Sequence, residues 1–195
     1  YDNEIPKWIE SYVRQKQYSI SPTATLLLSE FVGSDLTRLA SEIDKMLLNI
    51  GESKQIEEDL VRKYVGQSKE YTIFDLQKAL IDKDVLKANR IIHVFSQNPK
   101  DNPIIPMVTI LFQFFTKVLL THQATDKNEN TLAELLSVNR FFVKDYMAAS
   151  RKYPLPKVIQ IIHFLREADL QSKGVESGSM EEGDILKELV FKILH

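Results

Sequence analysis

Residues 34–51 read SDLTRLASEIDKMLLNIG, and this stretch carries the clearest helical signal in the chain. Its apolar residues recur three and four positions apart, as on one face of an α-helix: Leu36, Leu39, Ala40, Ile43, Met46, Leu47 and Ile50. Asp35 precedes the first of them, where its side chain can accept a hydrogen bond from the first helical turn. Gly51 follows the last of them and is typical of a helix end. The stretch therefore predicts an amphipathic helix between Asp35 and Gly51.

Apolar residues recur at this helical spacing over almost the whole chain. The alternation of apolar and polar residues that is typical of strands is nearly absent. Ser21 and Asp84 are further candidates for helix N-caps, and Pro6 and Pro22 suit a first helical turn. Helices are expected near residues 5–17, 21–33, 35–51 and 57–65, and then near 73–81, 85–96, 104–123, 132–136, 140–152, 155–173 and 183–194. The sequence thus predicts an all-α fold, with a small four-helix module followed by a larger bundle of five to seven helices.

The polar residues 67–71 lack a helical period, so we place a domain boundary there. This boundary assigns residues 1–67 to the small module, 68–72 to a linker and 73–195 to the larger bundle. The segment 174–182 is rich in Gly, Ser and Glu, and we expect it to be a mobile loop.

The charge composition gives this chain no strong electrostatic reason to bind nucleic acid by itself. Charged residues make up 27% of the sequence and the formal net charge is -2, whereas nucleic-acid binding relies on clustered positive charge. The absence of cysteine excludes disulfides and thiolate metal sites, and it fits a cytoplasmic protein. The chain opens at Tyr1 without a secretory signal, and the missing initiator methionine indicates a piece of a longer protein.

The apolar stretch 103–120 approaches the length of a membrane-spanning helix. It also contains Pro106 near its start and several polar residues, which favours a central helix covered by its neighbours. We therefore expect no membrane contact. Phe112, Phe114 and Phe115 cannot all face one direction on a helix, so this helix is either central or has a surface that meets a partner.

The histidines do not predict a metal site. None of the four has another histidine three or four residues away, although paired spacing is common in helical metal sites: His93, His122, His163 and His195. His93 and His163 lie in apolar segments, where a hydrogen-bonded residue at the edge of the core is the simpler interpretation.

The sequence contains no motif for phosphate binding or nucleophilic catalysis. Neither G-x-x-x-x-G-K-[ST] nor G-x-G-x-x-G occurs, and no G-x-S-x-G elbow is present. Asp169 and Lys173 stand four residues apart and predict a surface ion pair, with a subunit contact as the alternative. The residues thus predict a protein that works by binding, without catalytic, cofactor or metal residues, and they leave its interface unknown.

Several short segments, taken in order, form a further pattern. They are Gly33-Ser34-Asp35-Leu36, Glu42-Ile43-Asp44-Lys45-Met46, Ile56-Glu57-Glu58-Asp59-Leu60-Val61, Thr72-Ile73-Phe74-Asp75-Leu76 with Ala79-Leu80, Ala168-Asp169-Leu170-Gln171-Ser172-Lys173 and Leu186-Lys187-Glu188-Leu189-Val190-Phe191. Together they resemble the C-terminal two-thirds of bacterial DNA polymerase III delta subunits, part of the clamp loader. Met46 stands where that family usually has Leu.

The resemblance implies a helical lid module of an AAA+-like subunit in residues 1–67 and a collar domain in 73–195. In that family the collars of five subunits pack into the ring that holds the clamp loader together during DNA replication. The implied partners are the loader's ATPase and delta-prime subunits, with DNA in the intact assembly. Contact with the sliding clamp is implied only for an N-terminal domain, which is missing from this sequence.

The resemblance also implies that this region senses no nucleotide. In ATP-using relatives, Gly-Ser and an apolar residue precede an Arg that senses the γ-phosphate. Here Gly33-Ser34-Asp35 is followed by Leu36, which cannot stabilise phosphate charge, and Arg38 is the nearest substitute. No enzyme activity is therefore expected of this region, although the full-length protein belongs to the DNA polymerase III holoenzyme.

Two other functions stay open from the sequence. One is a stand-alone helical adaptor or regulatory protein unrelated to replication. The other is a helical enzyme with an unrecognised site, which a compact polar pocket with at least two titratable groups would favour.

Overall fold

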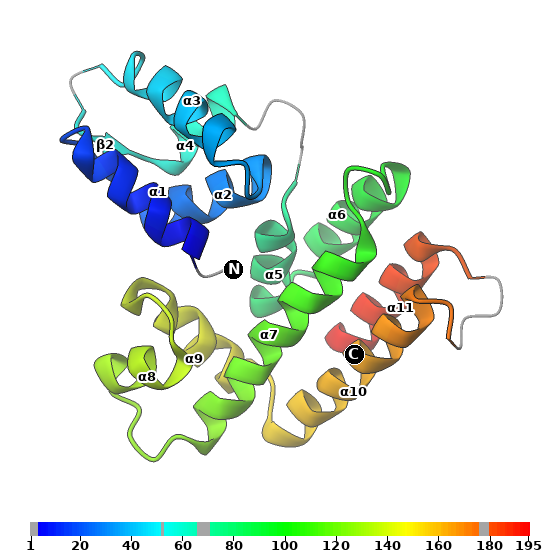
Figure 1. The fold of residues 1–195 in the computed structure, drawn as a ribbon. Helices are drawn as coiled ribbons and strands as arrows, with labels where there is room; N and C mark the ends of the chain where they lie inside the picture. The colour runs from blue at the N-terminus through cyan, green and yellow to red at the C-terminus, as the bar shows by residue number, and fades with distance from the viewer. Residues whose placement is uncertain (1–3, 52, 66–70, 176–179) are drawn as a thin grey trace. The chain divides into compact units, whose positions relative to one another are not determined.

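The computed structural model describes residues 4–51, 53–65, 71–175 and 180–195. It divides into two compact units, unit 1 up to Thr72 and unit 2 from Ile73 to His195 (Figure 1). Helices dominate both units, and the strands found in the described part are only two residues long, so the all-α prediction is confirmed. Most of the expected linker and the centre of the expected loop at 174–182 lie outside the described residues.

The described residues of unit 1 form four helices around a core of their own. They are α1 (Glu4–Gln15), α2 (Pro22–Val32), α3 (Leu36–Leu47) and α4 (Glu58–Tyr64). The side chain of Ser21 caps α2 by accepting a bond of 3.3 Å from the Ala24 N–H. Asp35 caps α3 by accepting a bond of 3.0 Å from the Arg38 N–H. Both predicted N-caps are therefore confirmed.

Helix α3 ends at Leu47, before the position predicted from Gly51. The backbone N–H of Asn49 bonds to the Met46 carbonyl, and the Asn49 side chain donates to the Lys45 carbonyl at 2.8 Å. These bonds satisfy carbonyls of the last helical turn and replace the helical pattern with a tighter turn. Gly51 then takes up a left-handed conformation, with φ of 68°, beyond the end of the helix.

Two short parallel strands, which the sequence did not predict, join the loops of unit 1. β1 (Ser19–Ile20) pairs with β2 (Gln55–Ile56), with Ser19 opposite Gln55. The pairing ties the loop after α1 to the loop before α4. A strand of two residues is too short to show the alternation from which strands are recognised.

Unit 2 is built around one long central helix. Its elements are α5 (Ile73–Asp82), α6 (Val85–Gln97), α7 (Ile104–Gln123), α8 (Glu129–Leu136), the 3₁₀ turn η1 (Arg140–Phe142), α9 (Val143–Lys152), α10 (Leu155–Ser172) and α11 (Glu182–Leu194). α7 packs against α10, α9, α8, α5 and α11, and crosses the bundle in Figure 1. The predicted cap of α6 is confirmed, since Asp84 accepts a bond of 2.9 Å from the Lys87 N–H.

Two boundaries in unit 2 differ from the prediction. α8 begins at Glu129, three residues before the expected start at Leu132, because Asn128 caps a polar first turn that an apolar period does not reveal. The expected helix 140–152 begins as the 3₁₀ turn η1, which is capped by Asn139.

α7 has the length and hydropathy to cross a membrane, and it is the only such helix among the described residues. Its inner side is fully packed, however, as in the core helix of a globular domain. The residues of that side are Ile104, Met107, Val108, Leu111, Phe114, Phe115, Val118 and Thr121.

Candidate functional site

The histidines of unit 2 do not converge. His122 donates from Nε2 to the Tyr153 carbonyl at 2.9 Å, and His195 lies 3.1 Å from the Phe191 carbonyl. His163 faces Glu167 at 3.1 Å on the outer surface, and His93 is exposed, so neither is at the edge of the core as expected. Within the described ranges, no group of three metal-ligating side chains comes together.

Tyr153 is the main polar anchor inside unit 2. It is fully buried between α9 and α10, and its hydroxyl donates to the Leu80 carbonyl of α5 at 2.7 Å. Its ring meets Phe115 of α7 edge to face, with ring centres 5.5 Å apart. Burial raises the pKa of the Tyr153 phenol well above its usual value, so it stays a neutral hydrogen-bond donor. Tyr153 thereby fixes the relative positions of three helices whose outer faces are candidate binding surfaces.

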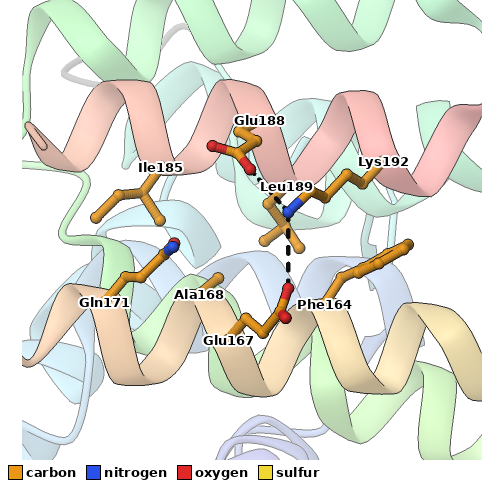
Figure 2. A pocket seen from close by; sticks show the side chains of 8 residues that line it. All are labelled: Phe164, Glu167, Ala168, Gln171, Ile185, Glu188, Leu189 and Lys192. Carbon is orange, nitrogen blue, oxygen red and sulfur yellow. Dashed lines mark ion pairs between the residues drawn. The ribbon is translucent and has the colours of Figure 1, made fainter. Parts of the chain in front are cut away.

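A shallow groove runs between α10 and α11 (Figure 2). Lys192 of α11 bridges it, with Nζ 2.7 Å from Glu188 and 3.6 Å from Glu167 of α10. These carboxylates raise the pKa of Lys192, chiefly through the hydrogen bond with Glu188. The space inside is about 10 Å³, roughly the room for one water molecule. The groove is therefore an interhelical contact with no room for a substrate.

The outer face of α7 is the clearest exposed apolar surface on the central helix. Ile105 and Phe112, seven residues apart, are 42% and 41% exposed, and Thr109 lies exposed between them. Phe114 and Phe115 are buried on the opposite side. The neighbouring phenylalanines thus divide between core and surface, which answers the question raised by their spacing. The periodicity alone did not identify Ile105 and Phe112 as exposed, although the polar residues Thr109 and Gln113 lie on the same outer side.

In unit 1, the residues that carry the family resemblance have structural roles. Glu42 pairs with Lys45 on α3. Asp44 joins α3 to α1, since it accepts a bond from the Tyr12 hydroxyl at 3.1 Å and faces Lys16 at 3.0 Å. The hydrogen bond with Asp44 raises the pKa of Lys16. These contacts hold the module together.

Arg38, the nearest substitute for a phosphate-sensing arginine, lies exposed on the first turn of α3. Leu36, at the position of that arginine in the resembled pattern, is 43% exposed.

The stretch 168–173 on α10 combines packing with a surface contact. Ala168 is buried against α11. Asp169 and Lys173 form the predicted ion pair, at 2.6 Å. Lys173 is half-exposed, so the pair is worth at most about 1 kcal/mol.

Fold and surfaces together define a class: a two-unit, mainly helical protein whose candidate sites are exposed helix faces. Exposed apolar residues on helix faces are typical of surfaces that bind other macromolecules. Residues 70–193 match the family model described as "DNA polymerase III delta subunit, C-terminal domain". The chain belongs to this family, as the sequence resemblance implied.

The fold is similar to that of a solved clamp-loader protein. The "Bacillus subtilis DNA clamp loader delta protein (YqeN)" superposes with a TM-score of 0.61 and 22% sequence identity. The match covers 99% of this chain and 56% of that one, so the chain spans about half the length of this structural relative. A comparison with curated proteins finds no match. Nothing in these findings supports the alternative of a stand-alone adaptor.

Proposed function

We propose that this chain is the lid and collar region of a clamp-loader delta subunit and acts in DNA replication as a non-catalytic assembly module. The observation that carries the proposal is the family match over residues 70–193. That range spans nearly all of unit 2, which begins at Ile73 and ends at His195. Unit 2 is then the collar domain, and it binds other clamp-loader subunits.

Unit 1 is then the lid module of an AAA+-like subunit, and this module does not sense a bound nucleotide. Leu36 offers no charge to a phosphate. The Asp35 carboxylate already occupies the N-terminus of α3, where it accepts a bond from the backbone N–H of Arg38. In this proposal the lid has a structural role only. The contacts of Asp44 with Tyr12 and Lys16 hold its helices α1 and α3 together.

The partners in this proposal are the loader's ATPase and delta-prime subunits. The outer face of α7 is our candidate for the contact, because Ile105 and Phe112 expose apolar surface that a helical partner can cover. The sliding clamp is reached only through the N-terminal domain of the full-length protein, and DNA is met in the intact assembly. The protein acts in the cytoplasm without membrane contact.

Site-specific photo-crosslinking tests this contact. A benzophenone amino acid replaces Phe112, and the chain is mixed with the ATPase and delta-prime subunits and irradiated. The matched control carries the same label at Phe141, which is also in unit 2 and is 45% exposed. We expect an adduct with a loader subunit from position 112 and little from 141. An adduct from 141 alone would place the contact on another face, and none from either position would contradict the proposed binding.

A further inference from the structure

A second candidate surface lies at one end of unit 2, where several helices finish or begin. Tyr153, just before α10, bonds to Leu80 near the end of α5. Lys157, in the first turn of α10, donates to the Lys192 carbonyl near the end of α11 at 2.8 Å. Lys83, just before α6, places Nζ 4.7 Å from the centre of the Tyr153 ring. The ends of α5, α9 and α11 therefore meet the starts of α6 and α10.

Three cations at this end meet helix carbonyls or an aromatic ring in place of a carboxylate. Lys83, Arg151 and Lys157 have no carboxylate at ion-pair distance among the described residues. Burial lowers the pKa of Lys157, and the charge of Lys83 lowers it further. The two ammonium groups therefore lie close enough to repel each other.

The nearby carboxylates are already engaged. Asp82 and Asp145 face Lys78 at 3.8 and 3.7 Å, and Asp82 also faces Lys152 at 3.6 Å. Asp84 caps α6. The three unpaired cations are thus left for an anionic partner.

Exposed aliphatic side chains lie in the first two turns of the helices that begin at this end, α6 and α10. Leu86, three residues after Lys83, is 81% exposed. Leu155 and Ile159 lie one turn apart on α10 and are 40% and 55% exposed. A surface that joins unpaired cations to exposed aliphatic side chains is complementary to a segment that carries both acidic and apolar residues.

We propose that this end of unit 2, with Lys83, Arg151, Leu86 and Ile159, binds an acidic segment of a partner protein whose apolar side chains cover the two aliphatic residues. Nucleic acid fits less well. Single strands stack their bases on aromatic side chains, whereas the exposed side chains here are aliphatic. This site is separate from the α7 face proposed for assembly, and its binding can be measured with the chain alone.

Fluorescence anisotropy with a labelled amphipathic peptide of glutamate and leucine tests the proposal at low salt. Lys83→Asn with Arg151→Gln removes two charges, and asparagine tolerates the φ of 55° at position 83. Leu86→Ser with Ile159→Ser removes the apolar part. The matched control, Lys100→Gln with Lys127→Gln, removes two exposed charges elsewhere in unit 2. Thermal unfolding checks that every variant is folded.

We expect saturable binding by the wild-type chain, about fivefold to tenfold weaker binding by each of the two test variants, and no change in the control. A peptide with glutamine in place of glutamate should bind poorly. Three results would each overturn the proposal: no saturable binding, an equal loss in the control, or tighter binding of a single-stranded DNA of equal charge that the same variants abolish.

Discussion

At the scale of the residue, Tyr153 links α5, α7 and the α9–α10 turn of unit 2. It follows α9, precedes Pro154, and reaches across to α5 through its hydroxyl. Its own carbonyl accepts from His122 of α7. Nothing in the sequence marks it, because a lone tyrosine between two helices has no period or motif to distinguish it. Its role comes from contacts 31 and 73 residues away along the chain.

Replacing Tyr153 by phenylalanine should destabilise unit 2 by about 1 kcal/mol, since it removes one buried hydrogen bond and keeps the ring. Urea unfolding followed by circular dichroism measures the change. Tyr146→Phe is the matched control, because it removes the hydroxyl of a half-buried tyrosine that has no hydrogen bond among the described residues. If both variants lose the same stability, the bond to Leu80 is not the cause.

At the scale of the element, α7 combines an apolar core face with a mixed surface face, on which Thr109 and Gln113 lie near Phe112. Phe115 is fully buried, whereas Phe112 is 41% exposed on the other side. The inner face holds the bundle together by packing, and we propose that the outer face meets a partner.

The two faces predict opposite outcomes for the same substitution. Phe115→Ala should cost about 3–5 kcal/mol of stability, because it leaves a cavity in the core. Phe112→Ala should cost less than about 1 kcal/mol and act instead on the association with other loader subunits. Chemical denaturation measures the stabilities, and co-elution with the loader subunits measures the association. Equal stability losses would show that α7 does not divide in this way.

Helix N-cap residues and long runs of apolar residues at helical spacing made most elements predictable. Ser21, Asp35 and Asp84 cap helices as expected, and α7 has the predicted bounds of Ile104 and Gln123. The sequence could not reveal features that depend on local polar bonds or on pairing between distant loops. Examples are the early end of α3 at Leu47, where Asn49 bonds back to the last turn, and the strand β2. The candidate site was less predictable, since exposure of a helix face depends on what the other helices cover.

At the scale of the whole molecule, the chain has two units with separate cores, and the family match falls on the second. Family membership accords with the exposed apolar residues of α7, which we propose as a binding surface. It also explains the resemblance that runs from Gly33 to Phe191 in the order expected for a delta subunit.

Size-exclusion chromatography with light scattering tests the central claim most directly. The 195-residue chain is mixed with the ATPase and delta-prime subunits of its clamp loader, and a full-length delta subunit is run in parallel. The account predicts a stable heteromeric complex in both arms, with Phe112→Ser weakening the complex. A complex with the full-length protein alone would make the N-terminal domain necessary for assembly. No complex in either arm, with every component folded, would contradict the proposed role in the clamp loader.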